Sequence, residues 1–279
     1  MPNDFNQQII EEFRANGGRV GGPFEGARLI LLTTTGARSG RQHTTPLGCL
    51  PDGERVLVIA SAGGSPHHPD WYRNILAHPR VTVEDGVFTY EAGAAVLEGA
   101  ERDHLFARAA EADQGWADYQ TRAGRTLPVV ALTPLPGPPR PNASSWGAAL
   151  KLVHDAFRRE LTLIRGELAD SGPGALGAQL RVNCLTFCRN LHGHHTNEDA
   201  GMLPAVAEQN PELAPVTERL YREHERIAAL LDTLRDLVSA GDADPAAVLP
   251  EFDRLTAELE SHLVYEEEHL IPLLDAAVT

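Results

Sequence analysis

Apolar residues fall into two different patterns along the chain, short runs in the first half and a helical period in the second. The short runs are rich in β-branched residues and are separated by turns that contain glycine, which is typical of a small barrel or sandwich. Five such runs are expected to form strands, at residues 28–36, 55–61, 80–86, 89–97 and 127–134. Helices are expected among them near residues 4–15, 69–77 and 100–114.

The second half, from Trp146 onward, has almost no strand signal. Its apolar residues recur at steps of three and four, the spacing of positions that face the core of a helical bundle. Three breaker segments, SGPG, NPELAP and AGDADP, divide it into four long stretches. We therefore predict a four-helix bundle, with Trp146 at the start of the inward seam of its first helix.

A proline-rich segment lies between the two patterns. Four prolines and one glycine within residues 134–139 interrupt regular secondary structure, and polar residues able to cap a helix follow them. The sequence thus predicts a two-domain α+β protein, with a β domain at residues 1–137, a linker at residues 138–145 and an all-α domain at residues 146–279.

The seams of the four predicted helices contain polar residues where apolar ones are expected. Each seam has a histidine, and two seams add a glutamate four residues later, about one turn along the same face. Imidazole and carboxylate suit iron, with manganese or zinc as alternatives, and carboxylates can bridge two metals in a bundle core. A polar core network without metal is the other interpretation. The six residues are His154, His194, Glu198, His224, His262 and Glu266.

The order of these residues, with two His-x-x-x-Glu pairs, resembles the hemerythrin-like domain of the HHE cation-binding type over about residues 146–277. A proline follows six residues after both glutamates, which favours His194 with Glu198 over the competing pair His195 with Asp199. The resemblance implies two bound iron ions that react with, store or sense oxygen, peroxide or nitric oxide. The set has fewer histidines than that of oxygen-carrying hemerythrins. Candidates for extra or outer partners are His192, His195, Tyr265 and His269.

Two glycine-rich stretches of the first half, TTTGARSGRQHTTPLG and IASAGGSPHHPDWYRNI, have the features of a binding site. The first places two guanidiniums, Arg38 and Arg41, beside hydroxyls and flexible backbone, which suits a phosphate or polycarboxylate. The second has a glycine pair at residues 63–64 that allows close backbone approach, and the flat ring of Trp71. Each feature also has a plainer interpretation, as a turn, a solvated arginine or a core tryptophan.

Together with ADYQTRAGRTLPVV, these stretches resemble the deazaflavin-dependent nitroreductase family over nearly all of residues 4–135. The resemblance implies a split β-barrel that binds the deazaflavin coenzyme F420 and, with its reduced form, passes hydride to quinones, nitroaromatics or activated alkenes. It makes Tyr119, in the substrate pocket, the candidate catalytic residue, while Trp71 and Asn74 brace the coenzyme. The implied coenzyme-binding residues are Arg38, Ser39, Arg41, Thr44 and Thr45 for the phosphate and acidic tail, with Pro46 in the same set, and Ala60, Ser61, Gly63 and Gly64 for the deazaflavin.

One position departs from the family pattern. Many relatives have lysine between the serine and the glycine pair, where its charge meets the acidic coenzyme, and this chain has Ala62. Loss of one charge-assisted contact costs about 1.5–3 kcal/mol, which weakens binding without abolishing it. FMN as the coenzyme, or a barrel retained as a scaffold, are therefore alternatives, and a homodimer formed through the barrel is a further option.

The charge balance argues against some classes of binding partner. The 279-residue chain has a net charge of −15, of which residues 1–145 contribute −3 (13 basic against 16 acidic) and residues 146–279 contribute −12 (11 against 23). So acidic a second half repels nucleic acid and anionic lipid. No run reaches the roughly 20 apolar residues of a membrane span, and the first residues do not resemble a signal peptide. We expect a cytoplasmic protein without stable membrane insertion that acts on a small molecule or O2.

The leading hypothesis is an oxidoreductase that uses reduced coenzyme F420 in the barrel and has a diiron bundle that reacts with oxygen or senses it. The alternative is a non-catalytic diiron sensor of oxygen or iron, or a metal-binding protein, whose barrel sequesters the coenzyme. Catalytic consumption of the reduced coenzyme separates the two.

Overall fold

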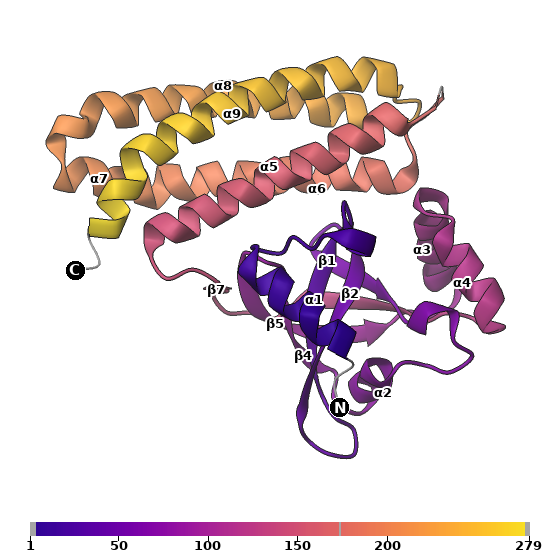
Figure 1. The fold of residues 1–279 in the computed structure, drawn as a ribbon. Coiled ribbons are helices and arrows are strands. Elements are labelled where there is room, and N and C mark those ends of the chain that lie inside the picture. The colour runs from indigo at the N-terminus through magenta and orange to yellow at the C-terminus, as the bar shows by residue number, and fades with distance from the viewer. Residues whose placement is uncertain (1–3, 173, 277–279) are drawn as a thin grey trace. The chain divides into compact units, whose positions relative to one another are not determined.

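A computed structural model of the protein describes residues 4–172 and 174–276. The chain divides into two compact units, residues 1–142 and 143–279. The first contains all the strands of the described residues, and the second is helical (Figure 1). The predicted fold class, a barrel followed by a four-helix bundle, is confirmed.

The first unit is a closed antiparallel barrel. Six strands pair in the order β4-β1-β2-β3-β6-β5, and β5 pairs again with β4 to close the ring. A short seventh strand continues the pairing from β5, and it occupies two residues of the proline-rich segment. The strands are β1 Leu29–Thr35, β2 Gln42–Asp52, β3 Arg55–Ile59, β4 Arg80–Glu84, β5 Phe88–Val96, β6 Val129–Pro134 and β7 Arg140–Pro141.

Alternation along β1 separates two hydrophobic layers. Ile30 and Leu32 point into the barrel and join a buried cluster that includes Val58, while Leu29 and Leu31 belong to another cluster outside it. The outer cluster also contains residues of α1 (Asp4–Ala15), whose apolar face covers this side of β1. A period of two in the strand therefore builds both layers.

The barrel differs from the predicted elements in two places. Strand β2 was not predicted, because Pro46 and Pro51 interrupt its β-forming residues; in the structure both prolines stand inside paired strands. Helix α4 (Gly115–Ala123) was also missed, since it directly follows α3 and is short. The other helices of this unit, α2 (Asp70–Ala77) and α3 (Gly99–Ala112), lie within one or two residues of the predicted positions.

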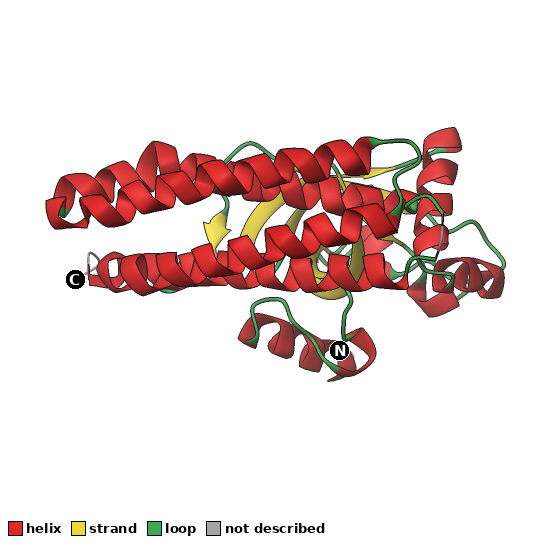
Figure 2. Cartoon of the chain, turned by 90° about the horizontal axis from the view of Figure 1, so that it is seen from above, coloured by secondary structure: helices red, strands yellow, loops and turns green. Residues whose placement is uncertain are grey.

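The second unit is a bundle of four long helical segments (Figure 2). A π turn, Glu198–Met202, continues the second segment into a short helix, so that this segment bends without breaking. The helices are α5 Trp146–Asp170, α6 Ala178–Asn197, α7 Leu203–Gln209, α8 Ala214–Ser239 and α9 Pro245–Ala276. No helix of the described residues combines the length and apolarity needed to cross a membrane.

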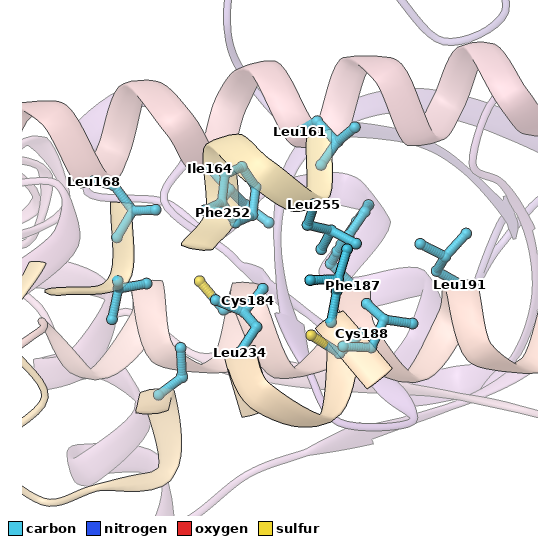
Figure 3. Close-up of a cluster of buried hydrophobic side chains, with 14 of the residues drawn as sticks. Leu161, Ile164, Leu168, Cys184, Phe187, Cys188, Leu191, Leu234, Phe252 and Leu255 are labelled. Carbon is cyan, nitrogen blue, oxygen red and sulfur yellow. The ribbon is translucent and has the colours of Figure 1, made fainter. Parts of the chain in front are cut away.

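The core of the bundle contains two apolar clusters. The larger one includes Leu161, Phe187, Leu234 and Phe252, and its side chains interdigitate between the helices (Figure 3). The smaller one lies further along the same helices and is described with the site below. One predicted seam position is wrong: Trp146 is 66% exposed, because it is the first residue of α5 and the packed part of the helix begins later.

Candidate metal centre and coenzyme site

The bundle gathers seven metal-ligating side chains in its interior, and they form two groups. One group consists of His195, His224 and His262, and the atoms that each residue offers lie within 4.8 Å of one another. The other group meets the same criterion and consists of His154, His194, Glu198 and Glu266. All six residues predicted as metal ligands are therefore brought together, and one further histidine joins them.

The donor atoms face one another without satisfying one another. His194 Nε2 lies 3.0 Å from Glu198 Oε1, and His154 Nε2 lies 3.5 Å from Glu266 Oε2, yet none of these atoms forms a hydrogen bond among the described residues. Both carboxylate oxygens of Glu198 and of Glu266 are buried and lack a hydrogen-bond partner among the described residues. Unpaired buried carboxylates and imidazole nitrogens are costly, and a cation between them offsets that cost.

The centre lies between the two apolar clusters of the core. Each helix has buried leucines on both sides of its ligand, such as Leu191 before and Leu203 after those of the second segment. His154 and Glu266 are completely inaccessible to solvent, and the side chain of His194 is the most accessible of the seven, at 14%. A small ligand fits this environment better than a large one.

Burial shapes the protonation of these groups. Desolvation lowers the pKa of His194 to about 3, with the nearby His154 acting in the same direction, and it lowers the pKa of His195 well below its usual value. It also raises the pKa of Glu198, which lies near Glu266. At Glu266 burial opposes ionisation, but the favourable interaction with the neighbouring histidines, His262 first, outweighs it and lowers the pKa. Neutral imidazoles are the form that binds metal.

His195 is the residue that the sequence interpretation placed outside the ligand set. The predicted pair His194 and Glu198 is gathered in one donor group, and His195, predicted as a candidate extra or outer partner, belongs to the other, whereas Asp199 is in neither. His195 is buried and stacks on His224 with ring centroids 4.2 Å apart, and Asp199 accepts a hydrogen bond from His224. The adjacent histidines, three and four residues after the seam position Leu191, are the sequence feature that could have signalled this arrangement.

The other proposed outer partners behave differently. His192 is exposed on α6 and does not reach the centre. His269 donates its Nδ1 proton to the carbonyl oxygen of Tyr265 at 2.7 Å, and the two rings pack at 4.1 Å. Tyr265 supports Arg219, whose guanidinium carbon lies 3.5 Å from the ring centroid.

The coenzyme residues predicted in the barrel lie around two turns. The first joins β1 to β2, where Arg38, Ser39 and Arg41 are exposed. Within the described residues, neither guanidinium forms a side-chain hydrogen bond or ion pair, so both are available to an anionic ligand. Gly36 is required here, because a Cβ would lie 2.4 Å from the hydroxyl of Ser39.

Asn74 fixes this turn to α2. Its side-chain oxygen accepts from the backbone of Ala37 at 3.0 Å, and its amide donates to Thr34 at 3.0 Å. Thr44 on the following strand shares a hydrogen bond with Thr33, and Thr45 and Pro46 are half-buried next to it. Asn74 is therefore a positioning residue for the turn.

The second turn follows β3 and contains Ser61, Gly63 and Gly64. Gly63 is exposed and has open space at its Cβ position, whereas Gly64 is covered by Arg122. Ala60 and Trp71 lie in the barrel core, so they support this turn from below and do not form its surface. Arg125 holds the turn region from the other side through the carbonyl oxygens of residues 60, 65 and 67.

Helix α4 brings Tyr119 to this turn. Arg122 donates to the carbonyl oxygen of Gly63 at 3.4 Å, and its guanidinium carbon lies 5.6 Å from the centre of the Tyr119 ring. Trp116 packs edge-on against Tyr119, with centroids 6.1 Å apart. The predicted catalytic tyrosine is therefore next to the second turn, held by aromatic and cationic neighbours.

Comparison with known proteins agrees with both halves of this description. The model of the F420H(2)-dependent quinone reductase family matches residues 6–134, and that of the hemerythrin HHE cation binding domain matches residues 148–274. The chain belongs to the F420H(2)-dependent quinone reductase family through its first half, and its second half is similar to the hemerythrin HHE cation binding domain. Both resemblances predicted from the sequence are confirmed.

Individual relatives are similar to the first half. F420H(2)-dependent quinone reductases from two strains of Mycobacterium tuberculosis, H37Rv and CDC 1551, are each 35% identical over 125 residues, which is 43% of this chain and 84% of the relative. A solved structure of an F420-H2 dependent reductase (FDR-A) is 40% identical and aligns with 38% of this chain and 93% of its own, with a TM-score of 0.35.

Proposed function

We propose that the barrel is an oxidoreductase that binds reduced coenzyme F420 and delivers a hydride from it to a quinone, a nitroaromatic or an activated alkene. Membership of the F420H(2)-dependent quinone reductase family supports the coenzyme. The observation that carries the proposal is a pair of exposed arginines, Arg38 and Arg41, whose guanidiniums have no partner among the described residues, at a turn that Asn74 holds in place.

The chemistry of the barrel divides between the coenzyme and the protein. The reduced deazaflavin supplies the hydride. Arg38, Ser39 and Arg41, with the threonines of β2, bind the phosphate and acidic tail through charge-assisted hydrogen bonds. The open backbone at Gly63 accepts the flat ring, and Tyr119 limits the space left for the acceptor.

We further propose that the bundle binds two iron ions. The seven converging donors and their unsatisfied buried atoms support this, and manganese or zinc would suit the same donors. Two iron ions would supply one-electron chemistry toward oxygen or a related small molecule. The residues of this chain hold the ions, exclude bulk water and keep the imidazoles neutral.

Binding of the coenzyme tests the barrel proposal. Replacement of both arginines by Arg38→Ala and Arg41→Ala should weaken F420 binding by at least tenfold, because two charge-assisted contacts are lost. The loss should be larger at high pH, where the phosphate and carboxylates are fully ionised. The matched control is Arg73→Ala, an exposed arginine on α2. Calorimetry that gave the same affinity for the double variant and the control would contradict the assigned role.

A second candidate function is a sensor of oxygen or iron in which the barrel sequesters the coenzyme. The enclosure of the metal donors between apolar clusters favours it, because such a centre admits only small ligands. Steady-state assays with quinone, nitroaromatic and alkene acceptors separate the two functions. Repeated turnover of reduced F420 supports the enzyme, whereas binding without turnover in any assay supports the sensor.

A further inference from the structure

Three carboxylates outside the donor groups contact the far side of the inward-facing histidines. We infer that Asp199, Glu223 and Glu267 are positioning residues of the metal centre, each of which accepts the Nδ1 proton of one histidine and so directs the Nε2 lone pair of that ring inward. The inference rests on the proposed metal binding by the bundle and adds the groups that orient its donors.

The geometry is the same at three histidines. His154 Nδ1 lies 3.0 Å from Glu267 Oε1, and His262 Nδ1 lies 3.1 Å from Glu223 Oε2. His224 Nδ1 lies 2.6 Å from an oxygen of Asp199. An ionised carboxylate only accepts hydrogen bonds, so in each pair the imidazole nitrogen is the donor.

The opposite nitrogens of the same rings point to the centre. The Nε2 atoms of His224 and His262 are 3.2 Å apart, and Nε2 of His154 is 3.5 Å from the Glu266 carboxylate. A ring that donates at Nδ1 presents a lone pair at Nε2, and the carboxylate increases the basicity of that nitrogen. The three contacts therefore select the tautomer that binds metal.

Two of the carboxylates are themselves fixed by arginines that extend to the surface. Arg158 donates to Glu267 at 2.6 Å, and Arg219 donates to Glu223 at 2.7 Å. In both cases the histidine and its carboxylate come from neighbouring helices, His154 from α5 with Glu267 from α9, and His262 from α9 with Glu223 from α8. The same three-part unit thus occurs twice and joins adjacent helices.

Zinc titration of the full-length chain provides the test. In competition with a chelator, Glu223→Gln and Glu267→Gln should each bind Zn(II) about 10–100-fold more weakly, the usual effect of loss of such an outer carboxylate. The matched controls are Glu225→Gln and Glu268→Gln, exposed glutamates on the same helices, which should bind as the natural chain does.

Nitrogen-15 NMR of the Zn(II)-loaded proteins distinguishes orientation from general stability. His154, His224 and His262 should each show a protonated Nδ1 in the natural chain. Glu267→Gln should shift the Nδ1 signal of His154 alone, and Glu223→Gln that of His262 alone. If a glutamine variant does not fold, Arg158→Met or Arg219→Met keeps the carboxylate in place and should shift the same single histidine.

The outcomes separate the two proposals. If the natural chain binds Zn(II) while the variants match their controls in affinity and in Nδ1 signals, the positioning role is overturned and the metal centre stands. If the natural chain binds neither Zn(II) nor iron, the proposed metal centre fails and this inference fails with it.

Discussion

At Ala62 the backbone conformation favours glycine, whereas an acidic ligand would favour a basic side chain. Its φ is 48°, in the left-handed region, and the two glycines after it are also left-handed. A residue with a Cβ costs about 1–2 kcal/mol in that conformation. The side chain is exposed beside Gly63, where the proposed deazaflavin lies, so a longer side chain here would reach the ligand without disturbing the core.

Two substitutions at this residue separate backbone strain from binding. Ala62→Lys should tighten F420 binding by about 10- to 100-fold, because it adds a charge-assisted contact to an acidic ligand. Ala62→Gly should instead raise the free energy of unfolding by about 1 kcal/mol and leave the affinity unchanged. Calorimetry and urea denaturation check both. An equal gain in affinity for the glycine variant would attribute the effect to the backbone and not to charge.

His194 makes the metal-free bundle sensitive to acid. Burial lowers its pKa to about 3 in the folded protein, whereas an unfolded histidine titrates near 6.5. The unfolded chain therefore binds a proton at this residue as the pH falls below about 6.5, and the folded chain does so only near pH 3. Stability is lost across that window.

The variant His194→Gln should be less sensitive than the natural chain. Between pH 7 and pH 5 the metal-free natural chain should lose about 2 kcal/mol of unfolding free energy relative to this variant, because the variant lacks the titrating group. Urea denaturation of both proteins at the two pH values measures the difference. The control His192→Gln removes an exposed histidine of the same helix and should follow the natural chain. If the difference in unfolding free energy between the natural chain and His194→Gln is the same at both pH values, the folded His194 titrates normally.

At the scale of the element, the π turn changes the register of the second helical segment after its histidines. The pair His194 and Glu198 lies on one face, and the next buried residue is Leu203, five positions after the glutamate. A regular α-helix would place that residue at three or four positions. The wider turn shifts the inward seam by one residue after Glu198. His195 lies before the turn, four residues after buried Leu191, so the regular period of α6 already brings it to the centre.

Loss of His195 should therefore affect one group of donors more than the other. His195→Ala removes one of three donors from the group with His224 and His262, and bound iron should fall from about two ions per chain toward one. Metal analysis after anaerobic reconstitution gives the count, and His192→Ala is the matched control. Two ions in the His195→Ala protein would exclude His195 as a ligand.

The histidines of α6 also mark the limit of prediction from the sequence. The spacing of His262 and Glu266 predicts a shared face, since three- and four-residue steps are fixed by helix geometry, and the structure gathers these residues. The preference for His194 over His195 rested on the proline six residues after each glutamate, and this local match does not show that two adjacent histidines both reach the core. Strand β2 was also missed. Its prolines weaken the local strand signal, but pairing across the sheet overrides that local propensity. Glu223 and Glu267 could not be recognised, since their role depends on contacts between helices.

For the whole molecule, the chemistry proposed for the two units differs in the number of electrons moved in each step. A deazaflavin normally gives up a hydride, which carries two electrons, whereas iron changes by one electron at a time. A diiron centre accepts two electrons in total, so the stoichiometry matches although the steps do not. Whether the units act together is therefore a question about turnover by the intact chain, not about either unit alone.

Oxidation of reduced coenzyme F420 by the iron-loaded chain, without an organic acceptor, answers that question. If the units form one oxidase, oxidation proceeds in air, stops in anaerobic buffer, and is lost in Glu266→Ala, because that variant lacks a buried metal donor. The control Glu268→Ala, an exposed neighbour, should retain it. The Arg38→Ala and Arg41→Ala double variant should also lose the activity, through the barrel. Equal rates with and without Glu266 would contradict a joint oxidase and leave the barrel as a reductase of organic acceptors beside an independent metal-binding bundle.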